Sequence, residues 1–226
     1  MTNRWLEFLE KETEKYHNLL EYSVNHWNYN DPLYFKIKEL LKPQAKILDI
    51  GCGFGLSDIY LQECGYSVIG IDNDINIVEQ ARRNAEYFNS SVKFEQGDAF
   101  DLSKYYDSFD LVFSVGVAEH FDRGITVKLI KEQAKCASYV ICVIPTKFTK
   151  YSGEITDERI YTISQLSGIF KEAELKVIGR FGYGNIISPF HNGIHRLLPH
   201  GLYRILQNNF SYAMGIVCIG RKKNEG

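Results

Sequence analysis

The chain has 226 residues, of which 45% are hydrophobic and 24% are charged, and its formal net charge at pH 7 is −2. This composition is typical of a soluble globular protein and excludes disordered and fibrous classes, and the length suffices for one domain with a sizeable core. The balanced charge provides no global positive field, so we expect neither a nucleic-acid partner nor stable membrane insertion.

The cysteines and the start of the chain predict a cytoplasmic location. The cysteines are odd in number, lack a C-x-x-C pair and lie mostly in apolar runs, as is usual in a reducing compartment. They are Cys52, Cys64, Cys136, Cys142 and Cys218. The first residues are charged every few positions, unlike a signal peptide, and the longest apolar run, 139–144, is too short to span a bilayer.

Two helices are predicted before residue 45. Apolar residues at helical spacing predict an amphipathic helix over residues 4–24, with Asn3 as its N-cap. Asp31 and Pro32 predict the start of a second helix, which runs to Leu41 and stops before Pro43. We assign residues 1–44 to an N-terminal helical cap.

From Lys46 onward, short apolar runs alternate with helical patterns. Runs without polar alternation suit strands that are buried on both faces of a parallel sheet, and their alternation with helices indicates the α/β class. The predicted strands cover residues 46–50, 67–72, 92–96, 110–115 and 139–144. After Pro145 we predict a helix at 164–173, a strand at 175–180, a helix around 193–207 and a last strand at 211–220.

No interdomain linker or internal repeat interrupts this pattern, so residues 1–226 are interpreted as one domain. Its predicted parts after the cap are a cofactor-binding core at 45–182, a lid insertion at 183–209 and the last strand at 210–222.

A glycine-rich loop joins the first strand to its helix. Residues 49–55 read Asp-Ile-Gly-Cys-Gly-Phe-Gly, and glycines there permit a sharp turn and close approach of a ligand to the backbone. The dinucleotide fingerprint G-x-G-x-x-G/A requires glycine or alanine where Leu56 stands, and the phosphate-loop motif is absent. The loop predicts a nucleotide-like ligand that is held without a phosphate-binding motif.

This G-x-G-x-G loop after Asp49 resembles the first motif of class I S-adenosylmethionine (SAM)-dependent methyltransferases. The resemblance covers residues 45–145. It implies a Rossmann-like, mainly parallel seven-stranded sheet with helices on both faces and an antiparallel last strand. It also implies SAM as the cofactor.

Acids lie at the ends of three successive strands, where open α/β sheets bind their ligands. SAM carries an ammonium and a sulfonium and lacks phosphates, so its pocket needs acids beside the glycines. By the resemblance, the methionine part, the ribose and the adenine each have their own residues. These are Asp49, Gly51, Gly53 and Gly55 for methionine, Asp72 with Asn73 for ribose, and Asp98 with Ala99 for adenine. The backbone at Ser114 and Val115 also faces the cofactor.

Glu119 and His120 follow the fourth strand and are the candidate catalytic pair. Methyl transfer from a sulfonium relies mostly on alignment, but a hydroxyl acceptor must lose a proton, and histidine titrates near neutrality. Similar pairs occur in methyltransferases of quinone biosynthesis, and the surrounding pattern also resembles the cyclopropane fatty-acid synthases. In a purely structural alternative, His120 begins the next helix and Glu119 caps it.

His191, His195 and His200 are spaced partly like metal ligands. We expect no metal there, because no acidic or thiol ligand lies close by in the sequence and the chemistry requires none.

The predicted function is transfer of a methyl group from SAM to an oxygen or nitrogen atom of a small biosynthetic molecule. C-methylation or cyclopropanation of a lipid or quinone-like acceptor is an alternative within the same family. A nicotinamide-dependent oxidoreductase, which Leu56 disfavours, and a non-catalytic SAM-binding protein are alternatives of other classes. The acceptor and the oligomeric state are not predicted.

Overall fold

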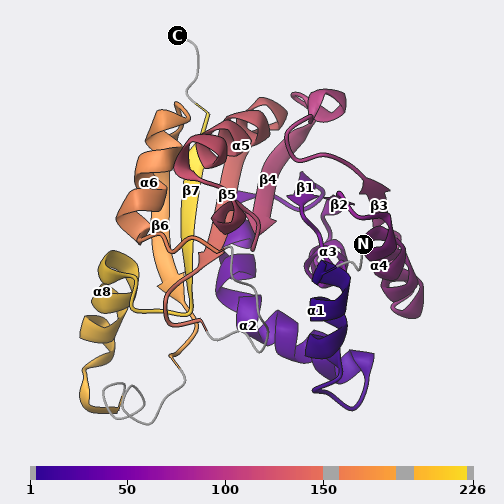
Figure 1. Ribbon diagram of the computed structural model, residues 1–226, viewed down its shortest axis with the longest axis horizontal. Helices are drawn as coiled ribbons and strands as arrows, with labels where there is room; N and C mark the ends of the chain where they lie inside the picture. Colours follow the sequence, from indigo (N-terminus) through magenta and orange to yellow (C-terminus); the bar gives the residue numbers. More distant parts are fainter. Residues whose placement is uncertain (1–3, 150–157, 187–195, 223–226) are drawn as a thin grey trace.

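The computed structural model describes residues 4–149, 158–186 and 196–222, and its centre is a seven-stranded sheet in the order β3-β2-β1-β4-β5-β7-β6 (Figure 1). The strands are β1 (Lys46–Ile50), β2 (Ser67–Asp72), β3 (Lys93–Gln96), β4 (Phe109–Val115), β5 (Ala137–Pro145), β6 (Lys176–Tyr183) and β7 (Gly215–Arg221). β7 runs antiparallel to both β5 and β6, and the other pairs are parallel. The predicted α/β fold with an antiparallel last strand is confirmed.

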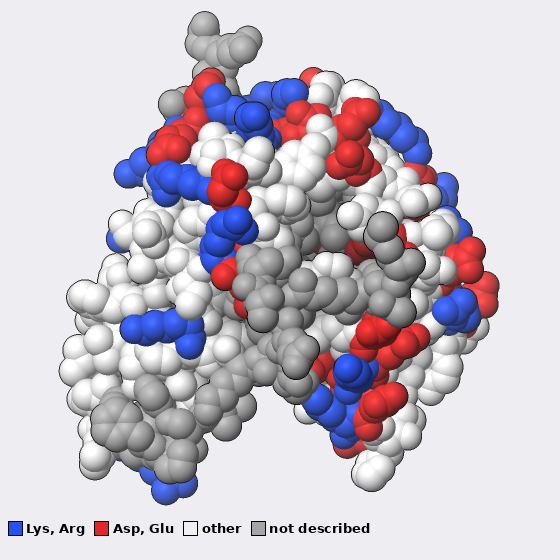
Figure 2. Space-filling view, in the orientation of Figure 1, with Lys and Arg blue, Asp and Glu red and all other residues white. Residues whose placement is uncertain are grey.

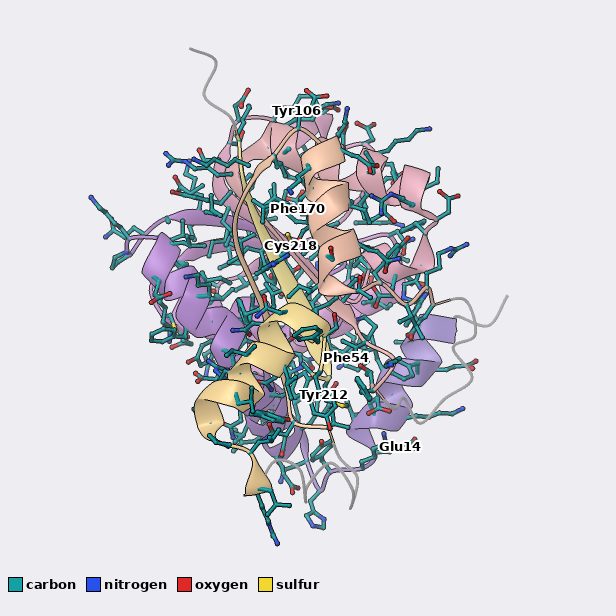
Figure 3. The ribbon with its side chains drawn as sticks, turned by 90° about the vertical axis from the view of Figure 1, so that its left-hand side faces the viewer. Glu14, Phe54, Tyr106, Phe170, Tyr212 and Cys218 are labelled. Atoms are coloured by element: carbon teal, nitrogen blue, oxygen red, sulfur yellow. The ribbon has the colours of Figure 1, made fainter. Side chains whose placement is uncertain are left out.

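Helices cover both faces of the sheet. On one face lie α2 (Leu19–Leu40), α3 (Leu56–Glu63) and α4 (Ile75–Tyr87), and on the other lie α5 (Arg123–Cys136) and α6 (Ile163–Glu172). Leu33 and Ile37 of α2 pack in one buried cluster with Phe113 of β4. On the opposite face, Phe170 of α6 packs in a cluster with Cys218 of β7 (Figure 3). The strands are therefore buried on both sides, as their unbroken apolar runs predict.

The N-terminal helices differ from the prediction. The break falls between α1 (Arg4–Thr13) and α2 rather than after residue 24, and α2 continues through Pro32. Asn18 starts α2, because its side chain accepts a hydrogen bond from the backbone N–H of Glu21 at 2.9 Å. Pro32 removes one helical N–H, yet the residues after it, Leu33 and Tyr34, are completely buried. Burial of this helical face outweighs the proline's local preference.

The C-terminal elements are shifted by a few residues from their predicted positions. β6 extends to Tyr183, and α8 (His200–Phe210) begins later than residue 193. Ser211, with a φ of 56°, ends α8 in the left-handed conformation, so β7 starts at Gly215 instead of residue 211. His191, His195 and Asn3 lie outside the described residues.

The helices, surface charges and cysteines of the described residues are as the sequence composition predicts. None of the described helices is long and apolar enough to cross a membrane. Basic and acidic side chains are interspersed on the face shown in Figure 2, without a single extended basic patch. All five cysteines are free thiols, and Cys64 alone among them is half-buried rather than buried.

Candidate functional site

The predicted cofactor residues meet at one edge of the sheet, since β1 to β4 are parallel and end at the same side. Ile50, at the end of β1, is paired with Ile71 and with Ser114, and Asp72 is paired with Gln96. The segments that follow these strands carry the glycine loop, Asp98 and the Glu119–His120 pair. The sheet register therefore brings four segments distant in sequence to one edge.

The glycine loop requires glycine for two different reasons. Gly51, Gly53 and Gly55 have φ values of +73°, +54° and +73°, which L side chains rarely adopt. A Cβ at Gly51 would lie 2.5 Å from Cγ2 of Val117, and a Cβ at Gly55 would lie 2.3 Å from Cζ of Phe94. At Gly53 a Cβ would lie 3.8 Å from Cδ1 of Leu9, an ordinary van der Waals contact, so glycine is required there by its φ rather than by a clash.

Asp72 connects the end of β2 to the glycine loop. One carboxylate oxygen accepts a hydrogen bond from the backbone N–H of Gly53 at 3.3 Å, and the other accepts from that of Asp74 at 3.1 Å. Burial raises the pKa of Asp72 above its usual range. The neighbouring Asn73 is exposed, and its carbonyl accepts a hydrogen bond from Gln96 at 3.0 Å. Asp72 is thus oriented beside the loop before any ligand binds.

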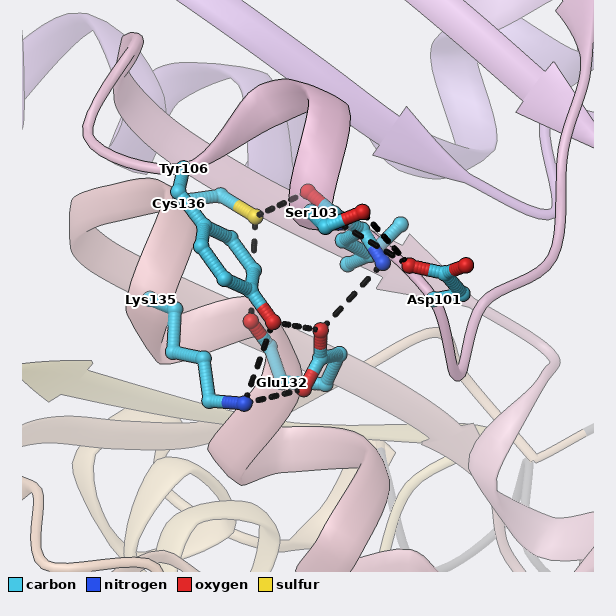
Figure 4. A network of polar contacts seen from close by, with 7 residues as sticks. Asp101, Ser103, Tyr106, Glu132, Lys135 and Cys136 are labelled. Atoms are coloured by element: carbon cyan, nitrogen blue, oxygen red, sulfur yellow. Dashed lines mark hydrogen bonds and ion pairs between the residues drawn. The ribbon is translucent and has the colours of Figure 1, made fainter.

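Asp98 begins the loop between β3 and β4. Its carboxylate accepts a hydrogen bond from the backbone N–H of Phe100 at 2.8 Å, and it is exposed, whereas Ala99 is half-buried. Farther along, this loop is anchored on α5, because Glu132 accepts hydrogen bonds from the backbone N–H of Leu102 at 3.2 Å and from the hydroxyl of Tyr106 (Figure 4). This anchor fixes the segment that carries Asp98 and Ala99.

Ser114 and Val115, at the end of β4, differ in burial and in the contacts of their side chains. Ser114 is completely buried, and its hydroxyl oxygen lies 3.3 Å from the amide nitrogen of Gln133 in α5, which donates to it. Its side chain therefore points into the helical layer, and only its backbone can face the edge. Val115 is half-buried and packs against the core beneath α2.

Glu119 and His120 lie in a short 3-10 helix, η2 (Ala118–His120), ahead of α5. Glu119 is 1% exposed and His120 is 14% exposed, and Oε1 of Glu119 is 3.9 Å from Nε2 of His120. The N-cap of α5 is Asp122, which accepts from Ile125. The interpretation of Glu119 as the cap, with His120 starting the helix, is therefore wrong.

Residues distant in sequence complete this region. The backbone N–H of Arg159 donates to the carbonyl of Glu119, and its guanidinium donates to the carbonyl of His120, each at 2.8 Å. One ligand-type atom from each of Glu119, His120 and Glu158 lies within 4.8 Å of the others. The ring of Trp5 in α1 contacts the ring of His120. Sequence reasoning did not identify Glu158 or Arg159, and no local motif marks them.

Asp58 is a third site residue that sequence reasoning missed. It lies in the first turn of α3 with 0% exposure, next to Asp49, which is 4% exposed. Burial, followed by the neighbouring Asp58, raises the pKa of Asp49 well above its usual range, and burial raises the pKa of Asp58 to about 7. The signal in the sequence was an acid between Leu56 and Ile59, on the apolar face of a helix.

α2 is hydrogen-bonded directly to the first turn of α3. The indole N–H of Trp27 donates to the carbonyl of Leu56 at 2.7 Å, and the hydroxyl of Tyr34 lies 2.9 Å from that of Ser57. From the same helix, Asn30 accepts a hydrogen bond from the hydroxyl of Tyr183 at the end of β6, at 2.9 Å. α2 therefore links the start of α3, directly after the glycine loop, to β6 at one edge of the sheet.

Comparison with known proteins identifies the core. Residues 47–138 match a family model described as a methyltransferase domain. Phosphoethanolamine N-methyltransferase 1 of Arabidopsis thaliana is 40% identical over 83 residues, which are 35% of this chain and 16% of that protein. Ribosomal protein L11 methyltransferase of Thermosipho africanus is 35% identical over 100 residues, 44% of this chain and 36% of that protein. The chain thus spans well under half the length of these relatives.

Solved structures share the fold over nearly the whole chain. Magnesium protoporphyrin IX methyltransferase from Synechocystis PCC 6803, with bound SAH, has a TM-score of 0.68 at 15% identity and covers 96% of this chain and 94% of its own. A SAM-dependent methyltransferase from Aquifex aeolicus has a TM-score of 0.65 at 13% identity, with 97% and 98% covered. Residues 47–138 thus match a methyltransferase domain, and the chain as a whole shares the strand order and fold of SAM-dependent methyltransferases.

Proposed function

We propose that the protein binds SAM and transfers its methyl group to an oxygen or nitrogen atom of a small molecule. The observation that carries this proposal is the hydrogen bond between Asp72 and the N–H of Gly53, which ties the acid at the end of β2 to the glycine loop. This arrangement suits a ligand with a ribose and a cationic amino-acid part.

Each part of SAM has candidate partners at the sheet edge. Asp49 and the three glycines would hold the methionine part, Asp72 and the adjacent Asn73 the ribose hydroxyls, and Asp98 with the N–H of Ala99 the adenine. The backbone at Ser114 and Val115 would border the cofactor. When bound, SAM supplies an electrophilic methyl group on a positively charged sulfur, and the enclosed edge aligns it with the acceptor.

His120 is the proposed general base for a hydroxyl acceptor. Glu119 is buried beside it, and a neighbouring carboxylate stabilises an imidazolium, so this pair can take up the proton that a hydroxyl loses on attack. An amine acceptor in its neutral form needs less help, because its lone pair is already available. The protein then contributes mainly alignment.

A small acceptor is supported by a groove at the same edge. β6 runs parallel to β5, since both are antiparallel to β7, and the end of β6 therefore lies on the site's side of the sheet. A groove of about 390 Å³ lies there, and its lining includes Tyr29, Tyr183 and Arg204. This volume is in the range of small-molecule sites. We propose that residues 1–44 and 183–209 cover the site and select the acceptor.

The named relatives act on different kinds of acceptor. One is named for phosphoethanolamine and another for a ribosomal protein, and both align with this chain over the core alone. The core therefore carries the cofactor assignment, and the choice of a small biosynthetic molecule in a reducing, cytoplasmic setting rests on the groove and the free thiols.

The test is binding followed by turnover. Calorimetric titration with SAM, with its demethylated product S-adenosylhomocysteine (SAH) and with NAD should show binding of the first two only. Transfer of a radiolabelled methyl group to a panel of small molecules, proteins and RNA should then label a small molecule. Binding of NAD alone would indicate an oxidoreductase, and SAM binding without transfer to any acceptor would indicate a non-catalytic protein.

A further inference from the structure

Asp49 and Asp58 form a buried pair of carboxyl groups beneath the glycine loop. Both residues are at least 96% buried, and their carboxyl groups lie close enough for each to influence the pKa of the other. Among the described residues, no basic or amide side chain donates a hydrogen bond to either oxygen of Asp58 or to Oδ1 of Asp49. A proton held between the two carboxyl groups would link them in the free protein.

Two buried carboxyl groups in contact do not both ionise readily, because each charge is poorly solvated and repels the other. None of the ion pairs among the described residues brings a lysine, arginine or histidine to this pair. A ligand that places a cation beside Asp49 would supply the missing compensation. The proposed cofactor does so, since its amino-acid part carries an ammonium group.

We infer that Asp58 is a positioning residue that shares one proton with Asp49, and that binding of the cofactor's ammonium group releases this proton. The inference rests on the proposed SAM-binding function. The proton balance is simple: the singly protonated pair plus the ammonium gives two carboxylates beside the ammonium and one proton in solution. No bond other than that O–H bond is broken.

The groups around the pair leave it as the titrating unit near neutral pH. Burial raises the pKa values of Tyr34 and Cys52, so both stay uncharged. Burial lowers the pKa of His26, which contacts Ser57 from α2, to about 4, so it is neutral as well. Asp72 also faces the loop, but it belongs to the ribose part of the site. A ligand with the ribose and without the ammonium group therefore separates its effect.

The experiment compares SAH with 5′-methylthioadenosine, which retains the adenosine and lacks the amino-acid part. Affinities are measured by calorimetry from pH 5.5 to 8.0, in buffers of different ionisation enthalpy that reveal proton release. For the wild type, we expect SAH affinity, relative to methylthioadenosine, to rise by about tenfold per pH unit below pH 7, with close to one proton released. Titration of Asp72 or His120 should change the affinities for both ligands equally, so it cancels in the ratio of the two affinities.

Asp58→Asn should weaken this relative pH dependence, because its amide can donate to Asp49 without titrating, while burial still acts on the pKa of Asp49. Its SAH affinity at pH 6 should exceed that of the wild type by about tenfold, a gain that structural damage would not produce. Asp74→Asn, which removes a carboxyl group near the same loop and preserves a helix cap, should behave like the wild type.

The outcomes separate the inference from the function on which it rests. SAH binding with a flat relative pH dependence and no proton release would overturn the shared proton and leave SAM binding intact. An unchanged pH dependence in Asp58→Asn would also overturn the role of Asp58. Failure of the wild type to bind either ligand at any pH would overturn the proposed function itself.

Discussion

The indole ring of Trp5 lies against the imidazole of His120, with ring centroids 4.6 Å apart and ring planes inclined by 68°. This contact joins the first helix of the chain to the candidate base. It also places a large apolar group beside the imidazole. The position of α1 therefore matters for the chemistry as well as for covering the loop.

Replacing Trp5 should affect turnover more than cofactor binding. Trp5→Ala removes the ring that orients His120, so we expect turnover to fall by about tenfold. Since Trp5 is assigned no contact with the cofactor, SAM affinity should change by less than about threefold. Steady-state kinetics and calorimetry measure the two effects. Trp5→Phe keeps an aromatic ring and should recover much of the loss; if alanine and phenylalanine variants are equally impaired, the ring contact is not the cause.

His120→Ala should separate catalysis from binding. For a hydroxyl acceptor, turnover should fall by about 10²- to 10⁴-fold while SAM affinity stays nearly unchanged. The wild-type rate should rise with pH as the imidazole loses its proton, and this rise should disappear in the variant. Rates measured against pH decide the question. A small loss that does not depend on pH would show that the acceptor needs no base, as expected for a neutral amine.

Removal of divalent cations should leave the activity unchanged. Glu119, His120 and Glu158 are close enough to share a cation, but the proposed role of His120 requires a ring nitrogen that is free to accept a proton. Turnover should therefore be the same before and after dialysis against EDTA. Loss of activity that Mg²⁺ or Mn²⁺ restores would instead assign the three side chains as metal ligands.

Asp72→Ala should weaken SAM binding by about 1–3 kcal/mol, as expected for the loss of charge-assisted hydrogen bonds to ribose hydroxyls. Part of this loss reflects the released N–H of Gly53, which donates to Asp72 in the free protein. Asp72→Asn keeps an acceptor for that N–H and should lose less. Calorimetry on both folded variants tests this, and unchanged affinity in Asp72→Ala would remove Asp72 from the site.

Without cofactor, Asp58→Asn should stabilise the fold at neutral and higher pH. The pKa of Asp58 rises from about 4 in the unfolded chain to about 7 in the folded protein, so the folded state binds more protons between these values. The stability of the wild type therefore falls as pH rises through this window. At pH 8 the variant should unfold with a free energy higher by about 1–3 kcal/mol, and at pH 4 the difference should largely vanish.

Urea denaturation at pH 4 and pH 8 measures these free energies of unfolding. Asp74→Asn serves again as the control and should show no such pH-dependent gain. An equal effect of Asp58→Asn at both pH values would show that the carboxyl group at position 58 is not destabilised by its own charge.

The sequence predicts the sheet well because burial on both faces demands apolar runs such as those of β4 and β5. The N-terminal helices are predicted at the wrong positions because Pro32 favours the start of a helix in the sequence. In the fold, burial of Leu33 and Tyr34 keeps α2 continuous through Pro32, and this burial depends on tertiary contacts. Within the site, the glycines and the acids that follow strands carry local signals. Arg159 reaches Glu119 and His120 from about forty positions away, and such contacts leave no pattern along the chain.

The hydrogen bonds between α2 and α3 indicate that the segment matched by the family model does not fold well without α2. The matched residues 47–138 exclude α2, yet Leu56 and Ser57 inside that segment are bonded to Trp27 and Tyr34 outside it. Excising the segment would expose these polar groups and the buried apolar side chains of β1, α3 and β4 that pack against α2. A chimera that exchanges acceptor-binding parts between relatives should therefore have its junction before α2, at about residue 16. The α2 helix then stays in the same chain segment as the core on which it packs.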